Sequence, residues 1–436
     1  MPVRHKKEVI SVGKKAVKFG GTSLCDAAQM QKAAEIVRAD PTREIVVVSA
    51  PGKRTANDEK MTDMLFRMNQ AEKSGERKDI FKRICTRLDA MIEELGLPLD
   101  FSDEYRYLEK SEGDFLISRG EYFCAKIFAS LLDFDFIDAK DVIFFHKDGT
   151  LHNEKTRKML EKRLKNGRKA VIPGFYGSLP NGKIHIFPRG GSDITGAVAA
   201  DGIDAEIYEN FTDVNGLLLA DPKIVEKPKT VPTVSYGELR RLSSMGASVL
   251  HADTILPIFE KKIPIVIRNT NDPNGDATYV LPQKQAQGIS GIVGQKGYTL
   301  FSVSRMGIGE KIGELKSLLS LLEQYTPYVY AVLHTVDACG FLVRAEDIKK
   351  REVEIIVKMY EEFEAETVLL TENMALLSVI GEGMAAQNVR LILETMAKIG
   401  AEPLLLDGGA DKLGVTIGFD EKYTETLIRA LYQALI

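Results

Sequence analysis

The sequence predicts an α/β protein with a mostly parallel central sheet and helices on both faces, followed by two smaller βαββαβ units. From about residue 15 to about residue 285, β-branched strand-like runs alternate with helical stretches. Runs that are apolar on both faces suit a sheet that is covered on both sides. After residue 285 the order strand, helix, hairpin, helix occurs twice, about 75 residues apart, which indicates a repeated unit.

Composition narrows the class of protein. The chain has 436 residues, with 58 Lys and Arg against 62 Asp and Glu. That balance argues against a nucleic-acid partner, and no apolar run of about 18 residues is present to cross a membrane. The four cysteines are scattered and form no Cys-x-x-Cys pair, so neither structural zinc nor disulfides are expected. These features predict a multidomain cytoplasmic enzyme.

The strands of the front part are short and apolar. They are expected at Ala16–Phe19, Ile45–Ser49, Ala170–Ile172, Ala205–Tyr208 and Ile263–Ile267. Between Met61 and Leu97, apolar residues recur at helical spacing, which predicts a helical segment on one side of the sheet. The stretch Gly177–Ile184 nearly fits a phosphate-binding P-loop. However, Ile184 replaces the hydroxyl that binds magnesium, and Pro180-Asn181-Gly182 predicts a hairpin turn instead.

The back part is expected to contain two copies of one unit. The first copy has strand Thr299–Val303, helix Ile312–Leu322, hairpin Tyr328–Val343 turning near Asp337–Gly340, helix Lys349–Phe363 and strand Ala365–Leu370. The second copy has strand Ala375–Val379, helix Val389–Met396, hairpin Leu404–Phe419 and helix Leu427–Leu435. It lacks a final strand, which Ile289–Val293 could supply, so that the first unit would be inserted within the second. The expected domains are 1–285, 286–370 and 371–436, with 289–294 completing the last.

Two glycine loops precede helices in the front part. Lys18-Phe19-Gly20-Gly21-Thr22-Ser23 directly follows a strand, and adjacent glycines let the backbone approach a phosphate closely. Pro188-Arg189-Gly190-Gly191-Ser192-Asp193 repeats this order of a cation, two glycines, a hydroxyl and an acid before a helix. Either loop alone could be an ordinary glycine turn or a capped helix. Together they favour a phosphate-binding site.

Three further segments carry candidate side chains. Ser49–Thr55 follows a buried strand, where open α/β sheets bind ligands, although a solvent-exposed turn is equally compatible. Glu121 in Ser118–Tyr122 could be a first-turn charge favoured by the helix dipole. Phe211–Lys223 on its own predicts two consecutive β-turns.

Taken in order, these five segments resemble aspartate kinase of the amino-acid kinase family. The block Ser244–His251 is also similar to its Met-Gly-Ala-Lys-Val-Leu-His segment, and the two repeats resemble its ferredoxin-like ACT units. The resemblance spans nearly the whole chain. It implies the amino-acid kinase fold and phosphorylation of the L-aspartate side chain by ATP to 4-phospho-L-aspartate. This is the first step towards lysine, threonine and methionine, with feedback by an end-product amino acid.

The implied chemistry suits the residues present. A carboxylate with a pKa of about 4 is already an anion at neutral pH, so the transfer needs no general base. It needs positioning and fixed positive charge, because both reactants are anions. By the motif match, Lys18 would neutralise the transferring phosphate oxygens, and Asp193 would organise Lys18 or Mg²⁺.

The resemblance also assigns binding residues. Glu121 would pair with the α-ammonium of aspartate, and Arg189 would bind a carboxylate bidentately. Ser49, Thr55 and Ser192 would add contacts to aspartate. The positions assigned to ATP are Lys18, Phe19, Gly20, Gly21, Thr212, Asp213, Leu218, Lys223, Ser248 and Val249. Mg²⁺ is expected to bridge the ATP phosphates rather than to occupy a metal site of the protein.

The sequence departs from the family at Ser248, where the motif usually carries lysine, and at His251-Ala252, where His-Pro is common. If that lysine helps to hold the nucleotide phosphates, its absence would weaken ATP binding or phosphoryl transfer. Lys223, Lys261 or Lys262 could compensate. We therefore hypothesise reduced but real activity.

ACT units in this family bind end-product amino acids, usually across a dimer. The expected ligand zone is the loop from Ser304 to Ile312, facing the Val336-Asp337 region of the first hairpin. Its candidate residues are Met306, Gly307, Gly309 and Asp337. Glycines there permit the close backbone approach that carboxylate capture requires. The expected effector is lysine, threonine or both, and the expected assembly is a homodimer or a dimer of dimers. The alternative is a dimerisation module that binds no ligand.

Two other functions remain open. A glutamate or acetylglutamate kinase would share the glycine loops, but it would not be expected to combine Arg189 and Glu121 with tandem ACT units. A catalytically weak amino-acid sensor is favoured only by Ser248 and is opposed by the presence of Lys18, Arg189 and Asp193.

Overall fold

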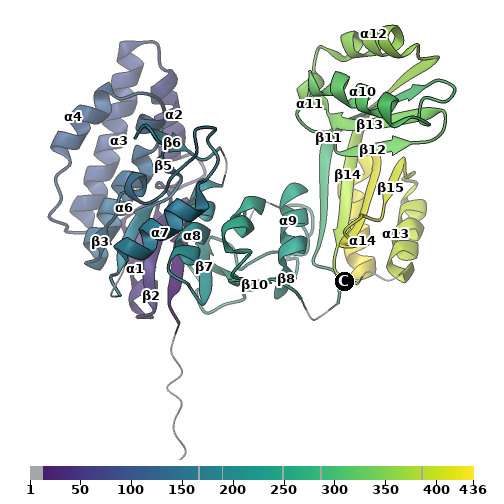
Figure 1. Ribbon diagram of the computed structural model, residues 1–436. Coiled ribbons are helices and arrows are strands. Elements are labelled where there is room, and N and C mark those ends of the chain that lie inside the picture. The colour runs from purple at the N-terminus through teal and green to yellow at the C-terminus, as the bar shows by residue number, and fades with distance from the viewer. Residues whose placement is uncertain (1–12, 165–166, 189, 248–249, 285–286, 384–385) are drawn as a thin grey trace, which may run out of the picture. The chain divides into compact units, whose positions relative to one another are not determined.

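Figure 1 shows the computed structural model, which describes residues 13–164, 167–188, 190–247, 250–284, 287–383 and 386–436. The chain divides into two compact units. The first contains the described residues up to Leu217, together with Thr230–Ser244 and 250–284. The second contains Leu218–Lys229, Met245–Ala247 and the described residues from 287 onward. Within the described ranges, every helix is too short or too polar to span a bilayer.

The first unit is built on an eight-stranded, mostly parallel sheet with the strand order β3-β4-β2-β1-β7-β9-β10-β8. Its strands are β1 (Lys15–Phe19), β2 (Arg43–Val48), β3 (Asp135–Phe136), β4 (Ala170–Pro173), β7 (Ile207–Thr212), β8 (Thr233–Ser235), β9 (Ile265–Asn269) and β10 (Thr278–Leu281). Only the β9–β10 pair is antiparallel among the described pairings of this sheet. The α/β class predicted from the apolar runs is confirmed.

Helices cover both faces of this sheet (Figure 1). The helices of this unit are α1 (Ala27–Arg38), α2 (Met61–Gln70), α3 (Ser74–Glu94), α4 (Ser102–Lys110), α5 (Gly113–Ile117), α6 (Arg119–Leu132), α7 (Asn153–Arg163), α8 (Gly191–Gly202) and α9 (Tyr236–Ser244), with 3₁₀ turns η1 (Gly21–Leu24), η2 (Ala139–Asp141) and η3 (Ala252–Ile258). Alternate strand residues point to opposite faces. Val17 and Phe19 enter the core formed with α1, α2, α3 and α6, while α8 packs on β1, β2 and β7 from the other side.

Two details of the first unit differ from the sequence prediction. The segment Met61–Leu97 forms two helices, because Ala71 and Lys73 adopt extended backbone between α2 and α3. The strand expected at Ala205–Tyr208 begins and ends later, at Ile207–Thr212. The polar residues inside β7 interrupt its apolar pattern, so the pattern alone did not predict where the strand ends. The turn predicted at Pro180-Asn181-Gly182 is confirmed, since it joins β5 (Tyr176–Ser178) to β6 (Ile184–Ile186).

The second unit is a six-stranded antiparallel sheet with the order β12-β13-β11-β14-β16-β15. Its strands are β11 (Gly291–Ser304), β12 (Ala331–His334), β13 (Ala338–Arg344), β14 (Thr367–Ile380), β15 (Leu405–Asp407) and β16 (Gly414–Asp420). Its helices are α10 (Ile312–Glu323), α11 (Ala345–Ile348), α12 (Glu352–Phe363), α13 (Ala386–Ile399) and α14 (Thr424–Leu435), with the 3₁₀ turn η4 (Glu421–Tyr423). The repeated strand, helix, hairpin, helix order is therefore present.

The two long central strands join the repeats. Residues 291–294 of β11, within the stretch expected to supply a strand to the second repeat, pair with 377–380 of β14. The strands expected separately at Ala365–Leu370 and Ala375–Val379 are one continuous strand, so that expectation was wrong. The polar break between them is an irregularity within β14, where Asn373 has φ +55°. A bulge of this kind bends a strand without ending it. The first hairpin also turns earlier than expected, at 335–337, because Ala338 already begins β13.

Candidate active site

The carboxyl ends of five strands meet at one edge of the large sheet. Backbone hydrogen bonds join them there: Ser49 N to Phe19 O (3.1 Å), Gly20 N to Phe211 O (3.0 Å), Gly174 N to Val48 O (2.9 Å) and Thr270 N to Thr212 O (2.8 Å). This edge is where open α/β sheets bind ligands. The structure thus brings together four residues from the sequence prediction, namely Phe19, Gly20, Ser49 and Thr212.

The loops after β1 and β2 pack backbone against backbone. Gly52 N donates to Gly21 O at 2.8 Å, and a Cβ on Gly21 would lie only 2.8 Å from the carbonyl oxygen of Ala50. Arg87 of α3 contacts both loops, because it donates to the carbonyl oxygen of Cys25 after β1 and to those of Gly52 and Glu59 after β2. Sequence reasoning missed Arg87, because a charged residue in a helix gives no sign of being buried.

Lys18 and Asp193 form the central ion pair of this edge. Lys18 Nζ lies 2.5 Å from Asp193 Oδ1, and Lys18 is buried although it carries a charge. The Nζ atom is also 3.7 Å from the point that a Cβ on Gly20 would occupy, so the ammonium lies over the glycine loop. Asp193 stands in the first turn of α8, beyond Gly190 in the left-handed conformation (φ +61°). The pairing places a fixed positive charge beside backbone that can approach a phosphate.

Glu121 is a buried carboxylate without a full set of partners. It lies in the first turn of α6 with 4% of its surface exposed, and its Oε2 atom has no hydrogen-bond partner in the described part of the chain. Burial raises the pKa of Glu121 to about 8, offset in part by the backbone N–H groups of Glu121 and Ala50. A Cβ on Gly120 would lie 2.8 Å from Ala50 Cβ, so the glycine lets α6 reach the end of β2. Such a carboxylate is suited to binding a cation.

The remaining candidates fall in different places. Ser192 packs against the end of β4, where a Cβ on Gly174 would lie 2.6 Å from its Oγ atom. Thr55 is exposed in the loop after β2, and Asp213 is exposed beyond β7, where Thr212 Oγ1 donates to it at 3.2 Å. Leu218 and Lys223 belong to the second unit. Arg189, Ser248 and Val249 lie outside the described residues.

The structure adds polar residues that the sequence prediction did not name. Asn210 donates to Asp193 Oδ1 at 3.0 Å, and Tyr208 donates to the backbone oxygen of Asp193 at 3.2 Å. Ser23 and Thr270 share a buried hydrogen bond of 2.7 Å between the loops after β1 and β9. The sequence feature that could have identified Asn210 is in β7, where the polar residues Glu209 and Asn210 interrupt an otherwise apolar buried strand.

In the second unit, the loop between β11 and α10 is joined to the first hairpin. Gly307 N donates to Asp337 Oδ1 at 2.7 Å, and Gly309 N donates to the carbonyl oxygen of Val336 at 2.9 Å. A Cβ on Gly309 would lie 1.8 Å from the carbonyl oxygen of Thr335, so glycine is required there. Met306 is 84% exposed at the tip of the loop. The four residues predicted for the regulatory site therefore lie on one loop and the hairpin it contacts.

Comparisons with known proteins show the family of this chain. Residues 13–269 match the model of the Amino acid kinase family. Aspartokinase 3 of Bacillus subtilis is 30% identical over 449 residues, covering 96% of this chain and 98% of that protein. The chain belongs to the aspartokinase family. Its activity is that of an aspartate kinase, as the sequence predicted, and its C-terminal sheet is the regulatory region of that family.

Solved aspartokinases share the fold. The crystal structure of Clostridium acetobutylicum aspartate kinase has a TM-score of 0.87 at 34% identity, covering 97% of this chain and 100% of that one. E. coli aspartokinase III in complex with aspartate and ADP has a TM-score of 0.80 at 21% identity, covering 97% and 99%. The same protein with lysine and aspartate has a TM-score of 0.77 at 21% identity, with the same coverage. The predicted amino-acid kinase fold with ACT-like units is confirmed.

Proposed function

We propose that Glu121 and the Lys18–Asp193 pair are the two working parts of the aspartokinase site. Glu121 binds the α-ammonium of L-aspartate, and Lys18 neutralises the phosphoryl group during transfer from ATP. The observation that carries this proposal is the buried, unpartnered oxygen of Glu121. The backbone N–H of Ala50, just after β2, donates to Glu121, and Lys18 is in β1, the strand next to β2, so both serve one sheet edge.

The reaction follows from charge and position. The attacking side-chain carboxylate is already ionised, so no residue needs to remove a proton. The barrier comes from bringing two anions together, and a preorganised cation lowers it without having to rearrange. Asp193 holds Lys18 in place for this purpose. In the same proposal Arg189, Ser49, Thr55 and Ser192 complete the aspartate site, and Thr212, Asp213, Leu218, Lys223, Ser248 and Val249 contact ATP together with the loop Phe19-Gly20-Gly21.

Mg²⁺ enters this proposal with the nucleotide. No group of three or more His, Cys, Asp and Glu gathers as a metal site in the described ranges. Mg²⁺ is commonly bound by one or two carboxylates together with substrate phosphates, and the exposed Asp213 beyond β7 is a carboxylate of this kind. When bound, the ion would offset the charge of the ATP phosphates. The ADP held by the E. coli relative supports a nucleotide site.

The regulatory proposal concerns the loop that carries Met306, Gly307 and Gly309, together with Asp337. We propose that it binds an end-product amino acid that inhibits the enzyme. The complex of the E. coli relative with lysine makes lysine the first effector to test, with threonine second. Asp337 supports this assignment, because its carboxylate already organises the loop backbone through Gly307 N.

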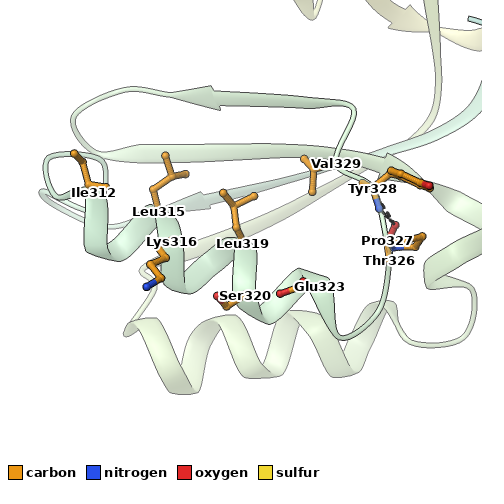
Figure 2. Close-up of a pocket in the computed structure, with 10 residues that line it drawn as sticks. All are labelled: Ile312, Leu315, Lys316, Leu319, Ser320, Glu323, Thr326, Pro327, Tyr328 and Val329. Atoms are coloured by element: carbon orange, nitrogen blue, oxygen red, sulfur yellow. Dashed lines mark hydrogen bonds between the residues drawn. The ribbon is translucent and has the colours of Figure 1, made fainter. Parts of the chain in front are cut away.

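We further propose that two copies of the chain assemble through the first ACT-like repeat. A groove of about 410 Å³ lies between α10 and the segment Thr326–Val329 (Figure 2). Ile312 is 87% exposed and Tyr328 is 66% exposed beside it. β12 is an edge strand of the sheet, so its outer backbone groups are open to pairing. These features suit a homodimer, or a dimer of dimers, joined at this edge.

We assign the enzyme to the cytoplasm. All four cysteines lie among the described residues as free thiols, of which Cys25, Cys124 and Cys339 are buried. Free thiols persist where the compartment is reducing.

The test of the proposed function is an assay of ADP release with aspartate, glutamate and acetylglutamate as acceptors. We expect turnover with aspartate, inhibition by lysine or threonine, and little turnover with the other two acceptors. Turnover with glutamate or acetylglutamate instead would overturn the substrate assignment, and absence of turnover with aspartate would favour a sensor.

A further inference from the structure

Asn210 has a contact that neither the proposed mechanism nor the sequence motifs assign. Its Nδ2 atom donates to Asp193 Oδ1 at 3.0 Å, the same oxygen that lies 2.5 Å from Lys18 Nζ. Lys18 and Asn210 are register partners on the parallel strands β1 and β7. Their side chains therefore leave the sheet on the same face, where α8 carries Asp193.

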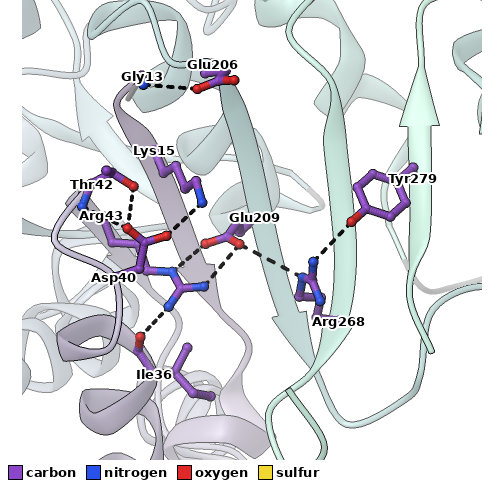
Figure 3. A network of polar contacts seen from close by, with 10 residues as sticks. All are labelled: Gly13, Lys15, Ile36, Asp40, Thr42, Arg43, Glu206, Glu209, Arg268 and Tyr279. Carbon is purple, nitrogen blue, oxygen red and sulfur yellow. Dashed lines mark hydrogen bonds and ion pairs between the residues drawn. The ribbon is translucent and has the colours of Figure 1, made fainter. Parts of the chain in front are cut away.

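The position of Asn210 is fixed from both sides of the sheet. Its neighbour Glu209 is almost fully buried and lies beside Arg43 and Arg268 (Figure 3). Because it is the next residue of the strand, its side chain points to the face opposite that of Asn210. Arg43 donates to both carboxylate oxygens of Glu209, at 2.5 and 3.2 Å. Arg268 Nε lies 3.9 Å from Glu209 Oε1. These contacts tie β7 to β2 and β9. Because successive residues of a strand alternate in direction, this cluster also aims Asn210 at α8.

An asparagine at position 210 lowers the stability of the folded state. Only 1% of its surface is exposed, and its Oδ1 atom has no hydrogen-bond partner among the described residues. A buried polar atom without a partner destabilises the folded state, whereas an apolar side chain of the same shape would not. Packing alone therefore does not account for an amide at this position.

We propose that Asn210 is a positioning residue for phosphoryl transfer. Its amide N–H holds the carboxylate of Asp193, which in turn holds the ammonium of Lys18 over the glycine loop. This inference rests on the proposed roles of Lys18 and Asp193. Without the amide, Asp193 keeps its charge but can rotate, and the cation loses its set position when the reacting groups meet.

The first test is N210L, which keeps the shape of the side chain and removes the donor. We expect kcat to fall about tenfold or more, because the lost positioning acts on the transition state. We expect the KM for aspartate to stay within about twofold, because Glu121 is untouched. The matched control is N69L in α2, the same substitution at a residue whose Oδ1 atom accepts from Gly113 N at 2.7 Å and which contacts neither Lys18 nor Asp193 in the described hydrogen bonds. It should keep kcat within about threefold of the wild type.

A swap of the two side chains distinguishes positioning from a purely structural role. D193N/N210D restores one carboxylate and one amide with their places exchanged, still beside Lys18. We expect this double variant to turn over faster than D193N alone, whereas a structural role predicts a further loss. Turnover of a folded N210L within about twofold of the wild type would overturn the proposal. If N210L does not fold, a double variant no more active than D193N would overturn it instead.

K18M separates this inference from the proposed function. If K18M keeps wild-type turnover, the assignment of Lys18 itself is wrong. If K18M is inactive while N210L is normal, only the role of Asn210 is wrong.

Discussion

The backbone N–H of Gly52 donates a 2.8 Å hydrogen bond to the carbonyl oxygen of Gly21, and neither residue has room for a side chain. A Cβ on Gly52 would lie 2.6 Å from the carbonyl carbon of Gly21. At this contact the two loops that carry the candidate site therefore pack main chain against main chain. Any side chain at this contact would separate them.

G52A should consequently damage both stability and activity. We expect the free energy of unfolding to fall by about 1–3 kcal/mol, the usual cost of overpacking, and kcat/KM to fall with it. Chemical denaturation and the ADP-release assay measure these effects. The control is G75A in α3, where a Cβ would meet nothing within 4 Å. That change should be neutral or stabilising, by about 0.5–1 kcal/mol. Equal behaviour of the two variants would contradict the packing argument.

K18M should lower kcat by about 10²–10³-fold, the range seen when one stabilising group of a transition state is removed. The same strand offers a matched control in Lys15, whose Nζ pairs with Asp40 Oδ2 at 2.7 Å. K15M removes a charge and an ion pair of the same kind, but at the other end of β1. Steady-state kinetics should show normal kcat for K15M. Similar losses in both variants would mean that Lys18 matters only for folding.

Aspartate binding should depend on pH through Glu121. Because burial raises its pKa to about 8, the unliganded carboxyl is mostly protonated below that pH, whereas the substrate ammonium needs the carboxylate. The KM for aspartate should therefore rise as the pH falls below about 8, by up to tenfold per pH unit. E121Q should raise the KM and remove this dependence. A KM that is independent of pH in the wild type would contradict the assignment.

The same shift has a consequence for stability. The pKa of Glu121 is higher in the folded chain than the ordinary value of 4.5, so the folded state binds this proton more tightly. Its contribution is therefore fully present below about pH 4.5 and is lost as the pH rises towards 8. E121Q, which cannot ionise, should show a higher Tm than the wild type at pH 8 without substrate. An unchanged or lower Tm would mean that burial of the ionised Glu121 carboxylate does not destabilise the folded state.

D337A should weaken feedback inhibition without changing uninhibited turnover. The substitution removes the acceptor for Gly307 N, so the loop loses its set conformation. The inhibitor concentration that halves activity should rise about tenfold or more, measured with lysine and with threonine. Asp407 provides the control, because it accepts from Gly409 N at 2.8 Å in the equivalent hairpin of the second repeat. Inhibition that D407A weakens and D337A leaves intact would move the effector site to the second repeat.

S248K tests a motif position at which the sequence departs from the family. It restores the usual lysine of the motif, and we expect kcat/KM for ATP to rise. S244K, four residues earlier on α9, adds the same charge outside the motif position and should have little effect. No gain from S248K would count against a role for the missing lysine.

The α/β fold and the two glycine loops could be predicted from the sequence, because each depends on a short pattern of neighbouring residues. Lys18 and Asp193 were assigned from motifs, and the structure places them 2.5 Å apart. Glu121 was named as well, yet its burial could not be predicted from the sequence. A carboxylate in a first helical turn has the same local pattern whether solvent or protein surrounds it.

By itself, the sequence determined the α/β class, the repeated regulatory unit and the family, since periodicity and motifs are properties of neighbouring residues. Only the tertiary structure decided which polar groups, distant in the sequence, contact one another in the candidate site. Asn210, Asp193 and Lys18 come from three separate elements, and they meet because β7 lies beside β1 under α8. Likewise, Thr367–Ile380 is one strand because pairing with β11 continues across a polar break. Strand neighbours and burial arise from packing between remote segments, which no local pattern encodes.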